Sequence, residues 1–245
     1  MNLEICCGSS PDALAALACG ADRIELNSAL PLGGLTPSPG MLEAVLSRGN
    51  ACVLVMIRPR PGDFLYSPEE ADCMIRDIRL LTGLGAQGIV LGALTPEGDV
   101  DRDMCARLLD SCPPGIIRVF HRALDLCPRP EEALEQLIDL GFDHVLTSGG
   151  MPTAPEGADR IARLVRLARG RLRIVPGSGI HPDNVVPLLE KTGCDDVHLS
   201  ATCLRTSPGP RGLPGLETDY RTCDAALVRR MRQILDGTGS AGNRP

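Results

Sequence analysis

Apolar residues recur along the chain with two periods, one typical of buried strands and one typical of amphipathic helices. Short apolar runs lie at residues 3–7, 23–27, 51–58, 88–94, 115–122, 144–149, 173–179 and 196–201. Segments with helical periodicity follow at about 10–19, 38–48, 67–84, 101–111, 129–140, 157–169, 184–192 and 224–236. Strict alternation predicts a parallel sheet, and eight strand–helix pairs favour a closed α/β barrel of the (β/α)8 TIM type.

The segments between these elements support one continuous domain over residues 1–236. No Gly-x-Gly-x-x-Gly motif opens a helix after the first strand, which disfavours a dinucleotide-binding sheet. Long connections follow the second, third and eighth strands, on the face where barrel enzymes keep their active sites. The Gly-rich end, residues 237–245, is expected to be a disordered tail.

Polar side chains interrupt five of the apolar runs at alternate positions. Successive residues of a strand point to opposite faces, so Glu4 shares one face with Cys6, and Glu25 with Asn27. The same parity places Met56, Arg58, Val119, His121, His198 and Ser200 toward the barrel interior. Buried charges are costly unless they are paired. A shared, wet cavity lined by these groups is therefore the functional hypothesis.

Two carboxylates near an arginine and two imidazoles can move protons and hold an anion. In this enzyme hypothesis Glu4 or Glu25 is the general base, and His121 is the acid or the orienting group. Asp125 either orients the imidazole, accepts a hydrogen bond from Arg122, or caps its loop. The alternative for the carboxylates is a satisfied polar network that fills the barrel.

The predicted rim offers further groups that could bind a substrate. Arg58 and Arg60 are predicted to clamp a carboxylate or a phosphate. The Gly-Ser-Gly turn at Ser178 resembles the turns with which many barrels hold phosphate, although a simple tight turn explains it equally well. Ser148 and His198 add polar groups on the same rim.

Cys6 is the thiol that strand parity directs into the barrel. Soft ions such as Cu(I) prefer thiolate or thioether ligands, so Cys6 with Met56 or His198 is a candidate copper(I) site. A buried, unreactive cysteine is the alternative interpretation. Eleven cysteines without Cys-x-x-Cys spacing indicate neither a structural zinc site nor a disulfide framework, and they are typical of a reduced cytoplasmic protein.

Charge and hydropathy exclude several classes of partner. The net charge of -6 disfavours binding to nucleic acid or to an anionic membrane, because both require a cationic surface. No apolar run approaches the length of a membrane span. The expected ligand is therefore a small molecule or a copper ion.

Seven sequence blocks together resemble the copper homeostasis protein CutC family. They are Leu-Glu-Ile-Cys at 3–6, Gly-Ala-Asp-Arg-Ile-Glu-Leu at 20–26, Gly-Gly-Leu-Thr-Pro-Ser at 33–38, Met-Ile-Arg-Pro-Arg at 56–60, Gly-Asp-Phe-Leu-Tyr-Ser at 62–67, Phe-His-Arg-Ala at 120–123 and Leu-Thr-Ser-Gly at 146–149. The resemblance implies a cytoplasmic (β/α)8 barrel that forms a homo-oligomer, a dimer or a tetramer, and that takes part in copper tolerance or trafficking.

The resemblance also implies Cu(I) binding by cysteines at the ends of the first two strands. The first of these cysteines matches Cys6, whereas the second falls on Asn27, whose amide oxygen is a poor Cu(I) ligand. Two hypotheses follow. One is a copper homeostasis protein that binds Cu(I) at the barrel mouth, and the other is a TIM-barrel enzyme acting on a small phosphorylated or carboxylated metabolite.

Overall fold

The computed structural model describes residues 1–49, 51–210, 212–214 and 216–241. Its central strands are β1 (Asn2–Cys7), β2 (Arg23–Leu26), β3 (Cys52–Met56), β4 (Gly88–Leu91), β5 (Ile117–Phe120), β6 (His144–Thr147), β7 (Arg173–Pro176) and β8 (Asp196–Leu199). The α-helices are α1 (Ser10–Ala18), α2 (Pro39–Leu46), α3 (Pro68–Gly83), α4 (Arg102–Leu109), α5 (Pro130–Leu140), α6 (Ala158–Ala168), α7 (Val185–Thr192) and α8 (Ala225–Ala241). Two short 3-10 helices, η1 (Leu30–Leu32) and η2 (Arg122–Leu126), lie in connections.

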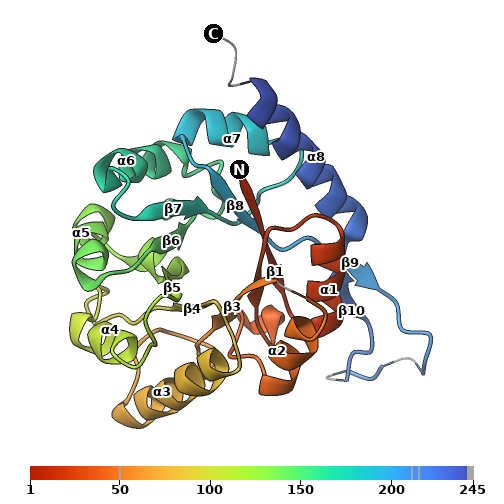
Figure 1. Cartoon of the computed structure of the whole chain (residues 1–245), viewed down its shortest axis with the longest axis horizontal. Coiled ribbons are helices and arrows are strands. Elements are labelled where there is room, and N and C mark those ends of the chain that lie inside the picture. Colours follow the sequence, from red (N-terminus) through yellow and green to blue (C-terminus); the bar gives the residue numbers. More distant parts are fainter. Residues whose placement is uncertain (50, 211, 215, 242–245) are drawn as a thin grey trace.

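The central strands form one parallel sheet that curves into a nearly closed barrel, with the α-helices outside it (Figure 1). Neighbouring strands follow the order β7-β6-β5-β4-β3-β2-β1-β8. A parallel bridge between Gly177 and His198 brings β7 next to β8. The predicted (β/α)8 architecture is thereby confirmed.

Local sequence signals determine where the helices begin and end. At the start of α3, the Ser67 hydroxyl accepts from the Glu70 amide at 3.3 Å, and the Glu70 carboxylate accepts from the Ser67 amide at 2.8 Å. This reciprocal pair satisfies two amides that a helix start leaves free. Helix α5 ends at Gly141, whose φ of +82° suits glycine far better than any other residue.

Apolar side chains pack on both sides of the strand layer. The larger cluster fills the space between strands and helices and includes Leu3, Ile5 and Ile24. A separate small cluster consists of Leu54, Met56, Val90 and Val119. Strand register places these four side chains on the face opposite to the helices. The interior of the barrel is thus apolar along β3, β4 and β5.

The structure differs from the sequence-based expectation near the C-terminus. Within the long connection after β8, β9 (Thr202–Arg205) pairs antiparallel with β10 (Tyr220–Cys223). Helix α8 extends to Ala241, beyond the end at 236 that the periodicity predicts, so the first part of the expected disordered tail is helical. The rest of that tail, residues 242–245, lies outside the described residues. No helix in the described part of the chain is both long and apolar enough to span a bilayer.

Candidate functional site at the barrel mouth

The pairing of β1 with both of its neighbours brings three charged side chains together. Glu4 lies opposite Arg23 of β2 and opposite His198 of β8. Its Oε1 lies 2.6 Å from His198 Nδ1, and its Oε2 accepts a hydrogen bond from Arg23 Nε. All three residues are buried. The polar face predicted for the barrel is therefore present along β8, β1 and β2, opposite the apolar cluster.

A buried ion network continues from Glu4 toward the amino-terminal end of the barrel. Asp196 is fully buried and accepts hydrogen bonds from Asn2 Nδ2 at 2.7 Å and from Arg173 Nη1 at 3.2 Å. Arg23 Nη2 lies 3.4 Å from the same carboxylate and so links it to Glu4. Two carboxylates balance two guanidinium groups, which offsets the cost of burying each charge. The sequence analysis did not assign Arg23, Arg173 or Asp196 to the site, although Arg23 shares strand parity with Glu25 and Asp196 with His198.

The charges of this network determine the protonation of Glu4 and His198. Burial alone raises the pKa of Glu4, but the hydrogen bond and charge of His198, together with the charge of Arg23, lower it to about 2. Burial lowers the pKa of His198, but the carboxylates of Glu25 and Glu4 outweigh this effect and raise it. These charges favour a Glu4 carboxylate beside a His198 imidazolium, in which Nδ1 is committed to Glu4, and Nε2 would release its proton on binding a metal ion.

Cys6, Glu25 and His198 form a group whose potential metal-ligand atoms all lie within 4.8 Å of one another. The Cys6 thiol lies 3.5 Å from Glu25 Oε1. Asn27 Nδ2 donates to Cys6 Sγ at 3.3 Å and to Glu25 Oε1 at 2.9 Å, while Glu25 Oε2 has no hydrogen-bond partner. Cys6 is half-buried, whereas Glu25 and His198 are buried.

The surroundings of this group favour the protonated thiol of Cys6 when no cation is bound. Burial, and then the nearby Glu25 carboxylate, raise the pKa of the Cys6 thiol well above its usual range. Burial is also the largest cause that raises the pKa of Glu25, and the Glu4 carboxylate adds to it. A cation at this position would favour the thiolate and the carboxylate over their protonated forms.

Arg58 and Arg60 do not form the predicted anion clamp. Arg58 Nη1 donates to the carbonyl oxygens of Leu32 and Gly34 at 3.3 and 3.2 Å, and Nη2 donates to that of Gly62 at 2.7 Å. Arg58 thus ties together the connections that follow β2 and β3. Arg60 is paired instead with Glu70 of α3 at 2.5 Å and with Asp63 at 2.9 Å.

His121 lies at the carboxyl end of β5, as predicted. Its Nδ1 accepts from the Ala123 amide at 3.2 Å, which places the proton on Nε2, and Nε2 has no partner. The ring packs against Phe64 with centroids 4.5 Å apart. Burial and the charge of Arg58 lower the pKa of His121 to about 3, so the imidazole is neutral. A side chain on Gly92 would collide with the ring, since an added Cβ would lie 2.6 Å from His121 Cε1.

Asp125 takes two of the three roles considered for it. Its carboxylate accepts from Arg122 Nε at 2.9 Å, from Thr147 Oγ1 at 2.5 Å, and from the amides of Ser148 and Gly150 at 3.0 and 2.9 Å. It therefore caps the connection after β6 and has no bond to His121. The Ser148 hydroxyl donates to the same carboxylate at 2.9 Å, which commits Ser148 to this loop.

Ser178 is also a loop residue in this structure. Its φ of +82° lies in the left-handed region, and its hydroxyl donates to the Pro152 carbonyl oxygen at 2.9 Å. The tight-turn interpretation of the Gly-Ser-Gly sequence thus describes it, and the hydroxyl is committed to the neighbouring connection. The predicted groups that do converge at the mouth are those on β1, β2 and β8, with Arg58 and His121 beside them.

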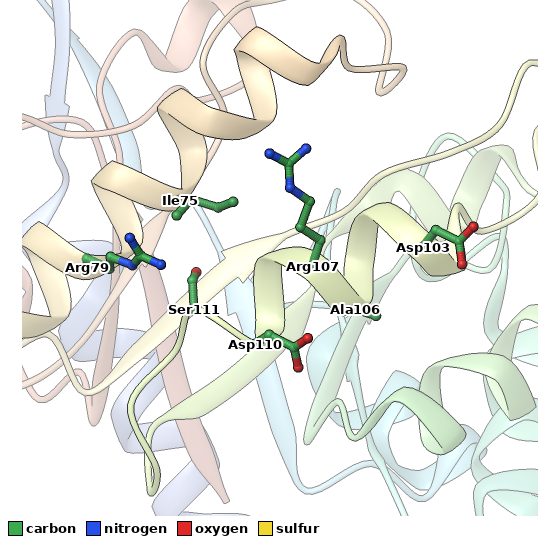
Figure 2. Close-up of a pocket in the computed structure, with 7 residues that line it drawn as sticks. All are labelled: Ile75, Arg79, Asp103, Ala106, Arg107, Asp110 and Ser111. Atoms are coloured by element: carbon green, nitrogen blue, oxygen red, sulfur yellow. The ribbon is translucent and has the colours of Figure 1, made fainter.

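A separate surface groove of about 500 Å³ lies between α3 and α4, outside the barrel (Figure 2). Its lining residues are Ile75, Arg79, Asp103, Ala106, Arg107, Asp110 and Ser111. Arg107 is bound to Asp72 of the neighbouring helix. The groove carries mixed charge and holds none of the groups that converge in the barrel, so we place the candidate site at the mouth.

Comparison with known proteins gives a consistent result. The model of the CutC family matches residues 1–203. A CutC protein of Treponema denticola is 44% identical over 216 residues, covering 88% of this chain and 87% of that protein. The human copper homeostasis protein cutC homolog is 46% identical and covers 84% of this chain and 75% of its own length.

A solved structure extends this similarity to the fold. The CutC protein of Streptococcus agalactiae superimposes with a TM-score of 0.78 at 31% sequence identity, covering 82% of this chain and 98% of that one. The family match, the relatives and the shared barrel agree over the same region of the sequence. This chain belongs to the CutC family.

Proposed function

We propose that this chain acts in copper homeostasis and binds Cu(I) at Cys6 and His198, with Glu25 beside them. One observation carries the proposal: the ligand atoms of these three residues lie within 4.8 Å of one another at the mouth of the barrel. The name of the human relative, copper homeostasis protein cutC homolog, supports copper as the ion concerned.

The chemistry of the donor set fits Cu(I). Thiolate is the ligand that soft ions prefer, and imidazole also suits copper. Glu4 accepts from His198 Nδ1, which resembles the carboxylate–histidine pairs that orient metal-binding imidazoles elsewhere. Asn27 supplies an amide N–H to Cys6 where the family resemblance implies a second thiol, so binding would depend on one thiolate and one imidazole.

Anaerobic titration of the reduced full chain with Cu(I), in competition with a coloured Cu(I) chelator, tests this proposal. We expect Cys6→Ser to remove the tightest equivalent and His198→Gln to weaken it. Cys73→Ser is the matched control, because Cys73 is an exposed cysteine on α3. If Cys6→Ser binds Cu(I) as the unmodified chain does, the site is not at Cys6.

A second candidate function is an enzyme that transfers protons at carbon. Glu25 Oε2 is buried without a partner, and the raised pKa of this carboxyl suits a general base. Schiff-base chemistry has no residue to support it in the barrel, since the single lysine of the chain, Lys191, is paired with Asp159 at 2.8 Å on the helices outside.

Exchange of carbon-bound protons for deuterium tests this second candidate. The chain is incubated in deuterated water with a panel of small 2-oxo and 2-hydroxy carboxylates and followed by proton NMR. We expect exchange that Glu25→Gln abolishes and that the exposed-site control Glu43→Gln on α2 retains. Equal exchange rates in Glu25→Gln and the unmodified chain would exclude Glu25 as the base.

We also propose that the chain works in the cytoplasm as a homo-oligomer, a dimer or a tetramer. The family resemblance supports both statements, and eleven free cysteines support a reducing compartment. Light scattering of the purified chain measures its mass in solution, and a monomer at micromolar concentration would contradict the oligomer. Fluorescence microscopy of the tagged chain tests its location.

A further inference from the structure

Three buried polar atoms without hydrogen-bond partners gather on the opposite side of the mouth from Cys6. They are Arg58 Nε, Tyr66 Oη and His121 Nε2. The side chains of Arg58 and His121 are almost fully buried, with 5% and 4% of their surface exposed. A buried polar group without a partner is costly, so each such atom calls for an explanation.

Arg58 and His121 lie against the same aromatic ring, and Tyr66 belongs to the same connection after β3 as Arg58. Arg58 Cζ lies 4.9 Å from the centroid of Phe64, and the His121 ring lies 4.5 Å from the same ring. The charge of Arg58 acts on both other groups. It is one of the causes that lower the pKa of His121, and it opposes the burial that raises the pKa of Tyr66 to about 12.

All three free atoms can donate a hydrogen bond. Arg58 offers Nε–H, Tyr66 offers its hydroxyl, and His121 offers Nε2–H because its Nδ1 already accepts from the Ala123 amide. The three side chains carry the positive charge of Arg58, while His121 is neutral. Donors around one positive charge suit an anion with acceptor oxygens.

The N–H groups of Arg58 that the backbone does not use indicate which anion could bind. Its Nη1 and Nη2 already donate to three backbone carbonyl oxygens, so two of its five N–H groups, one of them Nε–H, are not used by the protein backbone. One formal charge and three donors match a carboxylate better than a phosphate dianion. On the β6 rim, the amides of Ser148 and Gly150 are occupied by Asp125 and cannot cradle a phosphate instead.

We propose that Arg58, Tyr66 and His121 bind the carboxylate group of a small metabolite at the carboxyl ends of β3 and β5, beneath Phe64. This site shares no residue with the Cys6, Glu25 and His198 group, so it does not depend on copper binding. If the chain transfers protons at carbon, this site would anchor the substrate. The site itself is tested by a binding measurement that does not require activity.

The test is a titration of the reduced, metal-free full chain with pyruvate, followed through the imidazole nitrogen and proton signals of its four histidines. We expect a saturable change in the His121 signals. Tyr66→Phe removes one donor and keeps the ring, and we expect it to weaken pyruvate binding on the order of tenfold. Tyr220→Phe, at the other tyrosine, which lies exposed on β10, is the matched control and should leave the affinity unchanged.

Parallel titrations with acetate and inorganic phosphate define the ligand class. Acetate should shift the same His121 signals, and phosphate should bind more weakly than pyruvate. The proposal is overturned if neither carboxylate gives a saturable change, if phosphate binds more tightly, or if Tyr66→Phe binds pyruvate as well as the unmodified chain does. Pyruvate binding without deuterium exchange would reject the proton-transfer function and leave this site standing.

Discussion

Replacing Glu4 by Gln removes the charge that joins Arg23 and His198 inside the barrel. The pKa of Glu4 lies near 2 in the folded chain and near 4.5 when the group is unperturbed. Each unit of pKa difference corresponds to about 1.4 kcal/mol, so the charged form of Glu4 adds about 3 kcal/mol to the free energy of unfolding at pH 7. We expect Glu4→Gln to lose about this amount.

The pH dependence provides the sharper measurement. The unfolded chain binds a proton at Glu4 as the pH falls through about 4.5, whereas the folded chain resists protonation until about pH 2. The stabilisation is therefore complete above pH 4.5 and disappears as the pH falls toward 2. Urea unfolding of Glu4→Gln and of the unmodified chain at pH 7 and pH 3 should show a difference that shrinks at the lower pH.

Glu43 provides the control, because it is exposed on α2. Glu43→Gln should change the free energy of unfolding by less than about 0.5 kcal/mol at either pH. The reasoning is refuted if Glu4→Gln is as stable as the unmodified chain at pH 7. It is also refuted if the loss is the same at pH 3, since the effect would then not come from the charge of Glu4.

Two further substitutions test the loops around the mouth. Gly92→Ala would place a Cβ 2.6 Å from His121 Cε1, so we expect a lower melting temperature and a displaced His121 ring, measured by calorimetry and by the imidazole NMR signals. Unchanged signals would show that the ring tolerates a neighbour. Asp125→Ala leaves the amides of Ser148 and Gly150 without their acceptor, and we expect a loss of about 2–3 kcal/mol in the free energy of unfolding by urea. A loss below about 0.5 kcal/mol would mean that water replaces the carboxylate.

Sequence periodicity predicts the barrel because each strand and helix carries its own local pattern. Strand parity likewise places Glu4, Cys6, Glu25 and His198 on one face, and the register of β1 with β2 and β8 brings them together. The family resemblance is confirmed by the match over residues 1–203. These features follow from alternation along a strand, which the sequence displays directly.

Strand parity does not predict which groups the loop side chains bind. Arg58 and Arg60 were predicted to clamp an anion together, yet two nitrogens of Arg58 bind backbone carbonyl oxygens and Arg60 pairs with Glu70. Asp125 was a candidate partner for His121, yet it is held by the amides that follow β6. Nearly every residue has the same backbone carbonyl and amide groups. The sequence therefore does not indicate which of these groups a loop side chain will bind. The β9–β10 hairpin was missed because its Pro- and Gly-rich connection shows no strand alternation.

The three carbonyl bonds of Arg58 couple the two candidate sites mechanically. The connection after β2 lies over Asn27, close enough that a Cβ on Gly34 would come within 2.4 Å of its Oδ1. The connection after β3 carries Phe64 over His121. One guanidinium binds both connections. If one connection moves away from the mouth, Arg58 must break its hydrogen bonds to that connection or to the other. Opening the mouth at either connection would thus require breaking hydrogen bonds of the same guanidinium.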